Sequence, residues 1–282
     1  MRSLTQISRR QALQQALGLG ALAAAPLRAA AQIPLAVQVY SVRKEAAADL
    51  AGTLGQLAKM GYNGVEFAGF YNHSAAAVKK MLADTGLKAY SSHTGIKVLS
   101  GDELRKSIDF HAEIGCPYLV VPSLGRTDKA DDWRRHADAL TEIAGKLKPY
   151  KMRTGFHNHA VEFVPVEGKV PMEILFDNTP ADVIMQLDVG HCVRAGADPI
   201  AYINKYKGRS RSLHIKDFSP QSEDILLGQG IVKWPEVFKA ATTTGGTEIY
   251  IIEQERYPFP PLECVRSEEH TSELQSLSHR VW

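Results

Sequence analysis

The chain is poor in cysteine and has no run of like charge. Its three cysteines, Cys116, Cys192 and Cys264, form no CxxC pair. An odd number at these spacings argues against a disulfide framework or a thiolate metal site, and we interpret the first two as buried small residues. The 282 residues carry 33 Lys and Arg against 31 Asp and Glu, a net charge of +2, with no basic run interleaved with aromatic residues. This balance argues against a nucleic-acid partner.

A phosphate-binding glycine loop is also missing. The first predicted strand is followed by SVRKEAAAD, which has no GxGxxG, so an open doubly wound sheet becomes the second choice of fold. The length and the 44% hydrophobic content suit one barrel-sized domain as well as they would two small ones.

Both ends of the chain are predicted to lie outside the folded domain, which we place at 32–265. Arg9 and Arg10 precede the apolar stretch ALGLGALAAAP, and small residues at 29–31 precede Gln32. This resembles a twin-arginine export signal, so we expect a periplasmic or secreted protein without membrane attachment after cleavage. The apolar stretch is short for a membrane span. Residues 266–282, RSEEHTSELQSLSHRVW, resemble a translated sequencing-adapter artefact and are interpreted as non-native.

Between these ends, strand and helix patterns alternate eight times. Short β-branched runs bounded by Gly or Pro predict strands at 34–42, 64–69, 87–93, 118–123, 153–159, 183–189, 210–218 and 248–255. Helical patterns, several with Asp or Ser at the start and Gly at the end, lie at 49–61, 74–86, 102–115, 131–150, 172–178, 198–208 and 234–246. Eight such units predict an α/β fold, a closed (β/α)8 TIM barrel, with the eighth helix truncated after Glu263.

The last four predicted strands end in ionisable clusters: GFHNHAVEF, MQLDVGH, SLHIKDF and YIIEQE. Strands buried on both faces do not carry charge along their middles, so acids and histidines gathered at one end of successive strands predict a shared metal or catalytic site. Any one of these residues could instead be a surface histidine or a structural ion pair, such as Glu255 with Lys216. Four strands in succession are harder to explain in that way, because buried unpaired charges are costly.

Side chains two apart share one face of a strand. His157 and His159 should therefore point together, as should His214 with Lys216 and Glu253 with Glu255. Carboxylates combined with imidazoles form a mixed oxygen and nitrogen ligand set that suits Mn²⁺, Mg²⁺, Co²⁺ or Zn²⁺.

These motifs, with VQVYSVR near the start and LGQGIVKWPEVF before the last strand, resemble the xylose isomerase-like TIM-barrel family of sugar phosphate isomerases and epimerases from about Leu35 to Val265. The resemblance implies a divalent metal held by Asp188, His214, Glu253 and one ligand from strand five. That ligand is either His157 or Glu162. We prefer Glu162, because a third carboxylate better neutralises a hard ion.

The resemblance also implies that His191 and Lys216 face the hydroxyls of a carbohydrate substrate. A metal that binds a carbonyl and its neighbouring hydroxyl would stabilise an enediolate, formed when a base such as His159, His157, Glu162 or Glu253 removes the α-proton. Lys216 could supply a proton or hold the oxyanion. Reprotonation on carbon gives isomerisation or epimerisation, whereas loss of a β-substituent gives dehydration or cleavage of a 3-keto-glycoside.

Export and the missing phosphate cradle favour an unphosphorylated sugar or keto-sugar as substrate. Two other classes of function stay open: a metal-dependent phosphodiesterase of the abasic-site nuclease type, which the near-neutral charge and export disfavour, and a non-catalytic sugar-binding barrel. The sequence leaves the oligomeric state open, a homo-oligomer included.

Overall fold

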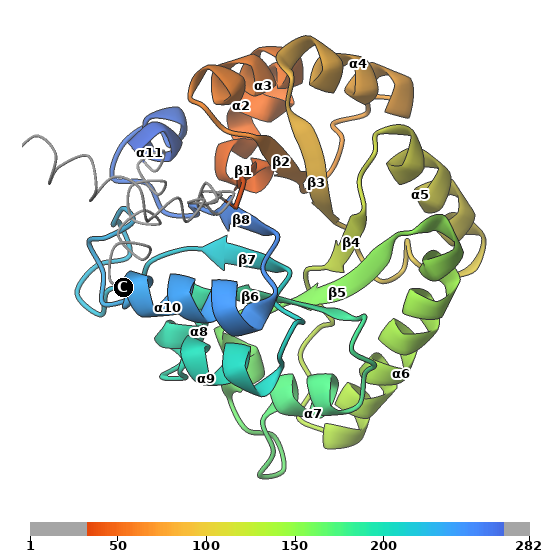
Figure 1. Ribbon diagram of the computed structural model, residues 1–282, viewed down its shortest axis with the longest axis vertical. Helices are drawn as coiled ribbons and strands as arrows, with labels where there is room; N and C mark the ends of the chain where they lie inside the picture. Colours follow the sequence, from red (N-terminus) through yellow and green to blue (C-terminus); the bar gives the residue numbers. More distant parts are fainter. Residues whose placement is uncertain (1–32, 268–282) are drawn as a thin grey trace, which may run out of the picture. The chain divides into compact units, whose positions relative to one another are not determined.

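Eight parallel strands close into a barrel with helices around it, as Figure 1 shows. The structure is a computed structural model that describes residues 33–267. Each strand pairs with the next along the chain, and β8 pairs with β1. The strands are β1 Leu35–Gln38, β2 Gly64–Phe67, β3 Lys88–His93, β4 Tyr118–Val121, β5 Arg153–His157, β6 Ile184–Asp188, β7 Ser212–Ile215 and β8 Ile249–Ile252. The (β/α)8 prediction is confirmed.

The helices lie close to the predicted ranges, and three of them begin at the predicted caps Asp49, Ser74 and Asp198. The Asp49 side chain accepts from the Gly52 N–H at the start of α3, and Ser74 does the same for Ala77 in α4. The helices are α2 Arg43–Ala48, α3 Leu50–Lys59, α4 Ala75–Thr85, α5 Gly101–Glu113, α6 Ala130–Leu147, α7 Pro171–Asp177, α8 Val189–Arg194, α9 Pro199–Lys205, α10 Trp234–Ala240 and α11 Pro261–Ser267. Short helical turns are η1 Val39–Val42, η2 Lys148–Tyr150, η3 Ala160–Phe163 and η4 Ala241–Gly245. The predicted export signal at 1–31 lies outside the described residues, as does the predicted non-native tail from 268 onward.

The first strand is shorter than its apolar pattern predicts. It ends at Gln38, whose side-chain oxygen accepts a 3.0 Å hydrogen bond from the Tyr40 N–H and turns the chain into η1. Two short helices, α2 after η1 and α8 directly after β6, were not predicted because each is only 6 residues long. Both lie at the end of the barrel where the ionisable clusters gather.

The alternation of side chains along each strand decides which of them fill the barrel. Alternate residues such as Val37 and Phe67 face outward and join the large apolar core beneath the helices. The inward residues at the amino-terminal end are apolar: Ala36, Tyr118, Val120, Ile184, Ile249 and Ile251. Those nearer the carboxyl ends of the strands are polar and buried: Gln38, Glu66, Ser91, Gln186 and His214. Polarity inside the barrel therefore rises toward the end where a TIM barrel carries its site.

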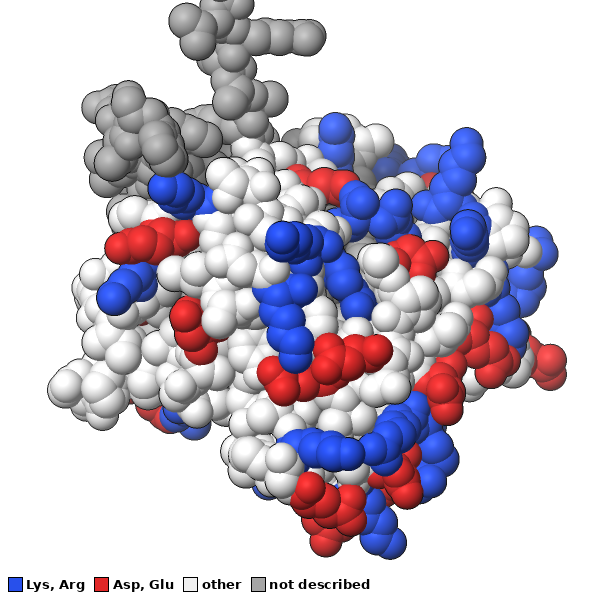
Figure 2. Space-filling view, turned by 60° about the horizontal axis from the view of Figure 1, so that its bottom comes forward, with Lys and Arg blue, Asp and Glu red and all other residues white. Residues whose placement is uncertain are grey.

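The outer surface carries mixed charge. Figure 2 shows acidic and basic side chains close beside one another over one face. Several are helix pairs one turn apart, such as Arg105 with Asp109 at 2.9 Å. Among residues 33–267, no helix is long and apolar enough to cross a membrane.

Candidate metal and catalytic site

Four buried side chains from the last four strands converge at the carboxyl end of the barrel. His157 ends β5, Asp188 ends β6, His214 lies in β7, and Glu253 follows β8. One ligand atom from each lies within 4.8 Å of the others. The exposed fraction of each residue is 5% or less. Strand pairing fixes part of this geometry, because Asp188 and His214 are register partners. Asp188, His214 and Glu253 are thus close enough to bind a common ion.

Two atoms of this group are buried without a hydrogen-bond partner among the described residues: Nδ1 of His157 and Oδ2 of Asp188. An orphaned buried polar atom costs about 1–3 kcal/mol, so such atoms are usually satisfied by something that binds there. Two imidazoles and two carboxylates in a dry pocket form a suitable donor set for a divalent ion. The residues present therefore fit a metal.

Glu66 of β2 holds His214 from beneath. One Glu66 oxygen accepts from Nε2 of His214 at 2.7 Å, while Nδ1 of His214 faces Glu253 at 2.9 Å. Burial lowers the pKa of His214, but the charge of Glu66 and the hydrogen bonds to Glu253 and Glu66 outweigh it and raise the pKa to about 10. Burial raises the pKa of Glu66, yet the neighbouring His93 and His214 hold it well below its usual value. His214 is therefore a charged imidazolium until another cation replaces its proton.

His157, not the preferred Glu162, joins the other three residues. The alternation of β5 turns the His157 side chain into the barrel, whereas Glu162 lies five residues further on, in η3. There its carboxylate accepts a 2.7 Å hydrogen bond from the His159 N–H and caps the turn. Among the described residues, the group of four therefore differs from the expected ligand set at this position. Burial lowers the pKa of His157 well below its usual value, aided by His214 and His93, so the imidazole is neutral and able to bind a metal.

The four residues predicted to act on the substrate form a continuous row, which we call the catalytic row: His157, His159, His191 and Lys216. The rings of His157 and His159 are 5.1 Å apart, and those of His159 and His191 are 5.0 Å apart. Nε2 of His191 lies 3.2 Å from Nζ of Lys216. This row leads from the metal-ligand group to the Lys216–Glu255 ion pair at the rim.

A glycine allows the row to close. A Cβ atom on Gly190 would lie 2.7 Å from the Lys216 carbonyl oxygen, so only glycine lets α8 approach the end of β7 this closely. His191 and Lys216 are brought into contact by that approach.

Burial lowers the pKa of His159, as does the neighbouring His191. Burial also lowers the pKa of Lys216, but Asp188, Glu253 and Glu255 outweigh it and raise the pKa. The site thus contains both a neutral imidazole, that of His159, and a charged ammonium, that of Lys216.

Sequence reasoning missed the residues contributed by strands two and three. Glu66 is fully buried and accepts from Gln38 at 2.6 Å and from Gln186 at 2.5 Å. His93 ends β3, and its Nε2 lies 3.0 Å from Glu66. The signal was available, because Glu66 is an acid within the apolar run GVEF, where a charge needs a partner.

The sequence matches one family of known proteins along most of its length. The profile of the family described as "Xylose isomerase-like TIM barrel" matches residues 54–276. The chain is 25% identical to inosose dehydratase 1 of a Bacillus cereus strain over 246 residues, which cover 73% of this chain and 82% of that protein. It is 23% identical to inosose dehydratase of Lacticaseibacillus casei over 70% of this chain and 79% of that protein.

Solved structures give the same fold. A sugar phosphate isomerase/epimerase from Parabacteroides distasonis ATCC 8503 is 27% identical, with a TM-score of 0.76 over 86% of this chain and 97% of that one. The IolI protein, solved with a bound zinc atom, is 16% identical, with a TM-score of 0.69 over 87% of this chain and 99% of that one. At 16% identity the second likeness shows the fold alone. The sequence relatives with named activities are enzymes, and the chain is an enzyme too.

Proposed function

The chain belongs to the xylose isomerase-like TIM-barrel family, and on that basis we propose that it is a divalent-metal-dependent enzyme that isomerises or epimerises an unphosphorylated sugar or keto-sugar through an enediolate. The observation that carries this proposal is the group His157, Asp188, His214 and Glu253 at the mouth of the barrel, with its two orphaned atoms. These four residues are the proposed metal ligands, with His157 in place of Glu162. A divalent ion bound there would polarise a substrate carbonyl and stabilise negative charge on its oxygen.

The neighbouring side chains supply the proton chemistry. His159 is a base with a lowered pKa, so it is neutral near pH 7 and able to accept the α-proton of a sugar bound against the group. Lys216 is charged and donates hydrogen bonds, which suits it to hold a substrate hydroxyl or the enediolate oxygen. His191 lies between them, 3.2 Å from Nζ of Lys216, and fits the role of orienting that ammonium and a second hydroxyl. Return of a proton to the opposite face of the same carbon completes an epimerisation, and return to the neighbouring carbon completes an isomerisation.

Dehydration is the second candidate reaction. The similarity to inosose dehydratases over 82% of their length favours it. The same enediolate would then lose a β-hydroxyl instead of regaining a proton, and His191 or Lys216 would protonate the departing oxygen. Cleavage of a 3-keto-glycoside follows the same course, with a sugar as the group that leaves.

We further infer export through a twin-arginine signal. Arg9 and Arg10, the apolar stretch after them and the small residues before Gln32 support it. Folded export would let the protein take up its metal before entering a compartment where copper or zinc competes more strongly. An exported enzyme would meet unphosphorylated sugars, which is why the proposal excludes sugar phosphates.

Proton exchange is the direct test of the proposed reaction. Purified protein loaded with Mn²⁺ or Mg²⁺ is incubated in D₂O with a panel of ketoses, inososes and 3-keto-glycosides, and deuterium at the α-carbon is measured by mass spectrometry. We expect incorporation with at least one sugar class, which the substitution Asp188→Ala abolishes and the matched surface substitution Asp128→Ala leaves intact. Tight sugar binding without any exchange would instead support a non-catalytic sugar-binding barrel.

A further inference from the structure

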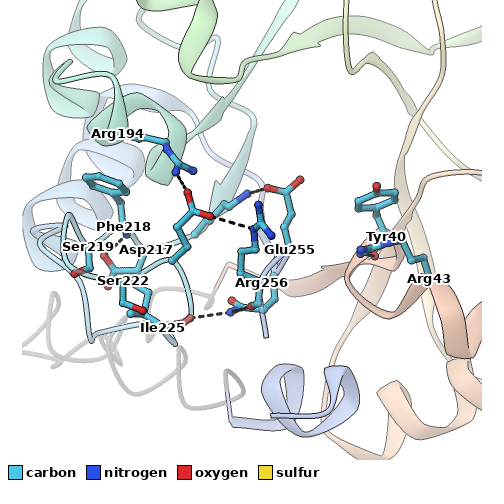
Figure 3. Close-up of a pocket in the computed structure, with 13 residues that line it drawn as sticks. Tyr40, Arg43, Arg194, Asp217, Phe218, Ser219, Ser222, Ile225, Glu255 and Arg256 are labelled. Atoms are coloured by element: carbon cyan, nitrogen blue, oxygen red, sulfur yellow. Dashed lines mark hydrogen bonds and ion pairs between the residues drawn. The ribbon is translucent and has the colours of Figure 1, made fainter. Parts of the chain in front are cut away.

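A polar cavity adjoins the catalytic row on the side away from the metal-ligand group. It has a volume of about 310 Å³, within the size range of small-molecule sites. Figure 3 shows Tyr40 and Arg43 on one side of this cavity and Arg194 with Phe218 on the other, with Glu255 and Arg256 between them. Lys216 also lines it, so the catalytic row and this cavity share a wall.

The lining carries one more positive charge than negative. Its ionisable members are four bases, Arg43, Arg194, Lys216 and Arg256, and three acids, Asp217, Glu223 and Glu255. Glu223 pairs with both Arg194 and Arg256, and Glu255 pairs with Lys216. The remaining base is Arg43, which forms no ion pair with any described residue.

Asp217 is occupied elsewhere. Its carboxylate accepts from the backbone N–H groups of Gly228 at 2.9 Å and Gly230 at 3.1 Å, and from Nε1 of Trp234 at 3.1 Å. These bonds fix the loop before α10. The role of Asp217 is therefore structural, because these bonds occupy its carboxylate.

Arg43 is held in place without using up its donors. Its Nη1 donates to the Tyr40 carbonyl at 2.9 Å and to the Tyr257 hydroxyl at 2.6 Å, and its guanidinium lies over the Tyr40 ring at 4.3 Å. No described residue accepts from Nε or Nη2. Such a guanidinium presents a fixed two-pronged donor, the geometry that binds a carboxylate.

A second cavity that Arg43 also lines lacks this imbalance. Its lining has three bases, Arg43, Lys44 and Arg256, and three acids, Glu45, Asp224 and Glu255. Of the two cavities that Arg43 lines, only the one that touches the catalytic row thus has an excess of positive charge.

We propose that this cavity, the Arg43 pocket, binds a carboxylate on the part of the substrate remote from its reacting carbonyl, so that the preferred substrate is an acidic sugar or a glycoside that bears a uronic acid. The inference rests on the proposed function, because it takes the reacting carbonyl to lie at the metal-ligand group. Tyr40 and Phe218 also line the pocket and would contact the body of that remote unit. A carboxylate suits the pocket better than a phosphate does, because one unpaired guanidinium matches a single negative charge.

Three hexoses that differ only at carbon six give a direct test. D-glucose, D-glucuronate and D-glucose 6-phosphate are titrated into the full Zn²⁺-loaded protein, and dissociation constants are measured by ligand-observed NMR. We expect glucuronate to bind about tenfold more tightly than glucose, the usual size of one charge-assisted hydrogen-bonded pair. Arg43→Met should remove that preference. Arg43→Lys should restore only part of it, and Lys44→Met, which removes a charge from the same helix but not from this pocket, should keep it.

Equal affinities for glucuronate and glucose in the wild-type protein would overturn the inference, as would a preference that survives Arg43→Met. Tighter binding of glucose 6-phosphate that depends on Arg43 would contradict the carboxylate assignment and identify phosphate as the anion. The titration requires no turnover. An Arg43-dependent preference therefore supports the pocket even where the exchange assay is negative, and equal affinities overturn it even where exchange is found.

Discussion

The substitution Glu66→Gln tests how the interior of the barrel supports its site. Glu66 accepts hydrogen bonds from the amides of Gln38 at 2.6 Å and Gln186 at 2.5 Å, from His214 at 2.7 Å, and from the Ser91 hydroxyl. A glutamine has the same shape but only one acceptor oxygen, and its amide nitrogen would face groups that are themselves donors. His214 would also lose the negative charge that keeps a proton on Nε2 and leaves Nδ1 directed at Glu253.

The expected loss follows from these contacts. Breaking a buried charged pair costs about 3–5 kcal/mol, and because glutamine keeps one acceptor we take the lower end, about 3 kcal/mol of unfolding free energy in the metal-free protein. For a domain of this size that corresponds to a fall of roughly 6–12 °C in Tm. Metal affinity should fall about 10–100-fold, as is usual when the residue that orients a ligating histidine is changed.

Urea unfolding and metal titration calorimetry measure the two effects. The matched control is Glu248→Gln, since Glu248 pairs with Arg211 near the amino-terminal ends of the strands and is about half exposed, where such a pair contributes no more than about 1 kcal/mol. If Glu66→Gln costs no more than Glu248→Gln and leaves metal affinity unchanged, the proposed support of His214 is wrong.

Three further outcomes are expected. The pKa of His214 in the folded protein is raised from 6.5 to about 10, so its contribution to the stability of the metal-free protein is complete below pH 6.5 and lost as the pH rises toward 10. Metal affinity should rise through the same pH window, up to about tenfold per pH unit if one proton leaves when the metal binds. Calorimetry in buffers of different ionisation enthalpy will detect that proton. Lys216→Met should lower kcat about 10²–10³-fold without changing metal content, whereas Lys44→Met should leave kcat unaltered, as steady-state kinetics on the substrate found by exchange will show. When Arg9 and Arg10 are both changed to lysine, a reporter fused to the first 40 or so residues should stay in the cytoplasm, as cell fractionation will show. Export of the reporter despite this change would count against the twin-arginine signal.

Much of the fold could be predicted because parallel strands leave a strong pattern. Runs such as YLVV and IYII are buried on both faces and stand between amphipathic helices, so their positions follow from composition and spacing. The strand ends were less predictable. β1 stops at Gln38 because its side chain bonds to the Tyr40 N–H, a local competition that apolar periodicity does not record.

The candidate site was predictable in part for the same reason. The carboxyl ends of the last four strands had to meet, which brought Asp188, His214 and Glu253 together. The strand-five residue required a choice between charge balance, which favoured Glu162, and strand alternation, which turns His157 inward. Alternation decides, because the backbone fixes the direction of a strand side chain, whereas Glu162 is already satisfied by the N–H it caps. Glu66 was missed because the residue that it supports, His214, comes from a strand far away in sequence.

The most direct test of the central claim is the metal content of the purified protein. After loading with Mn²⁺ or Zn²⁺ and extensive dialysis, inductively coupled plasma mass spectrometry should find about one ion per chain in the wild-type protein and in Asp128→Ala, whose carboxylate is exposed. Asp188→Ala and His214→Ala, if circular dichroism shows them folded, should retain almost none. Retention of the ion by both folded variants, or its absence from the wild type with every metal tried, would contradict a metal centre at the mouth of this barrel.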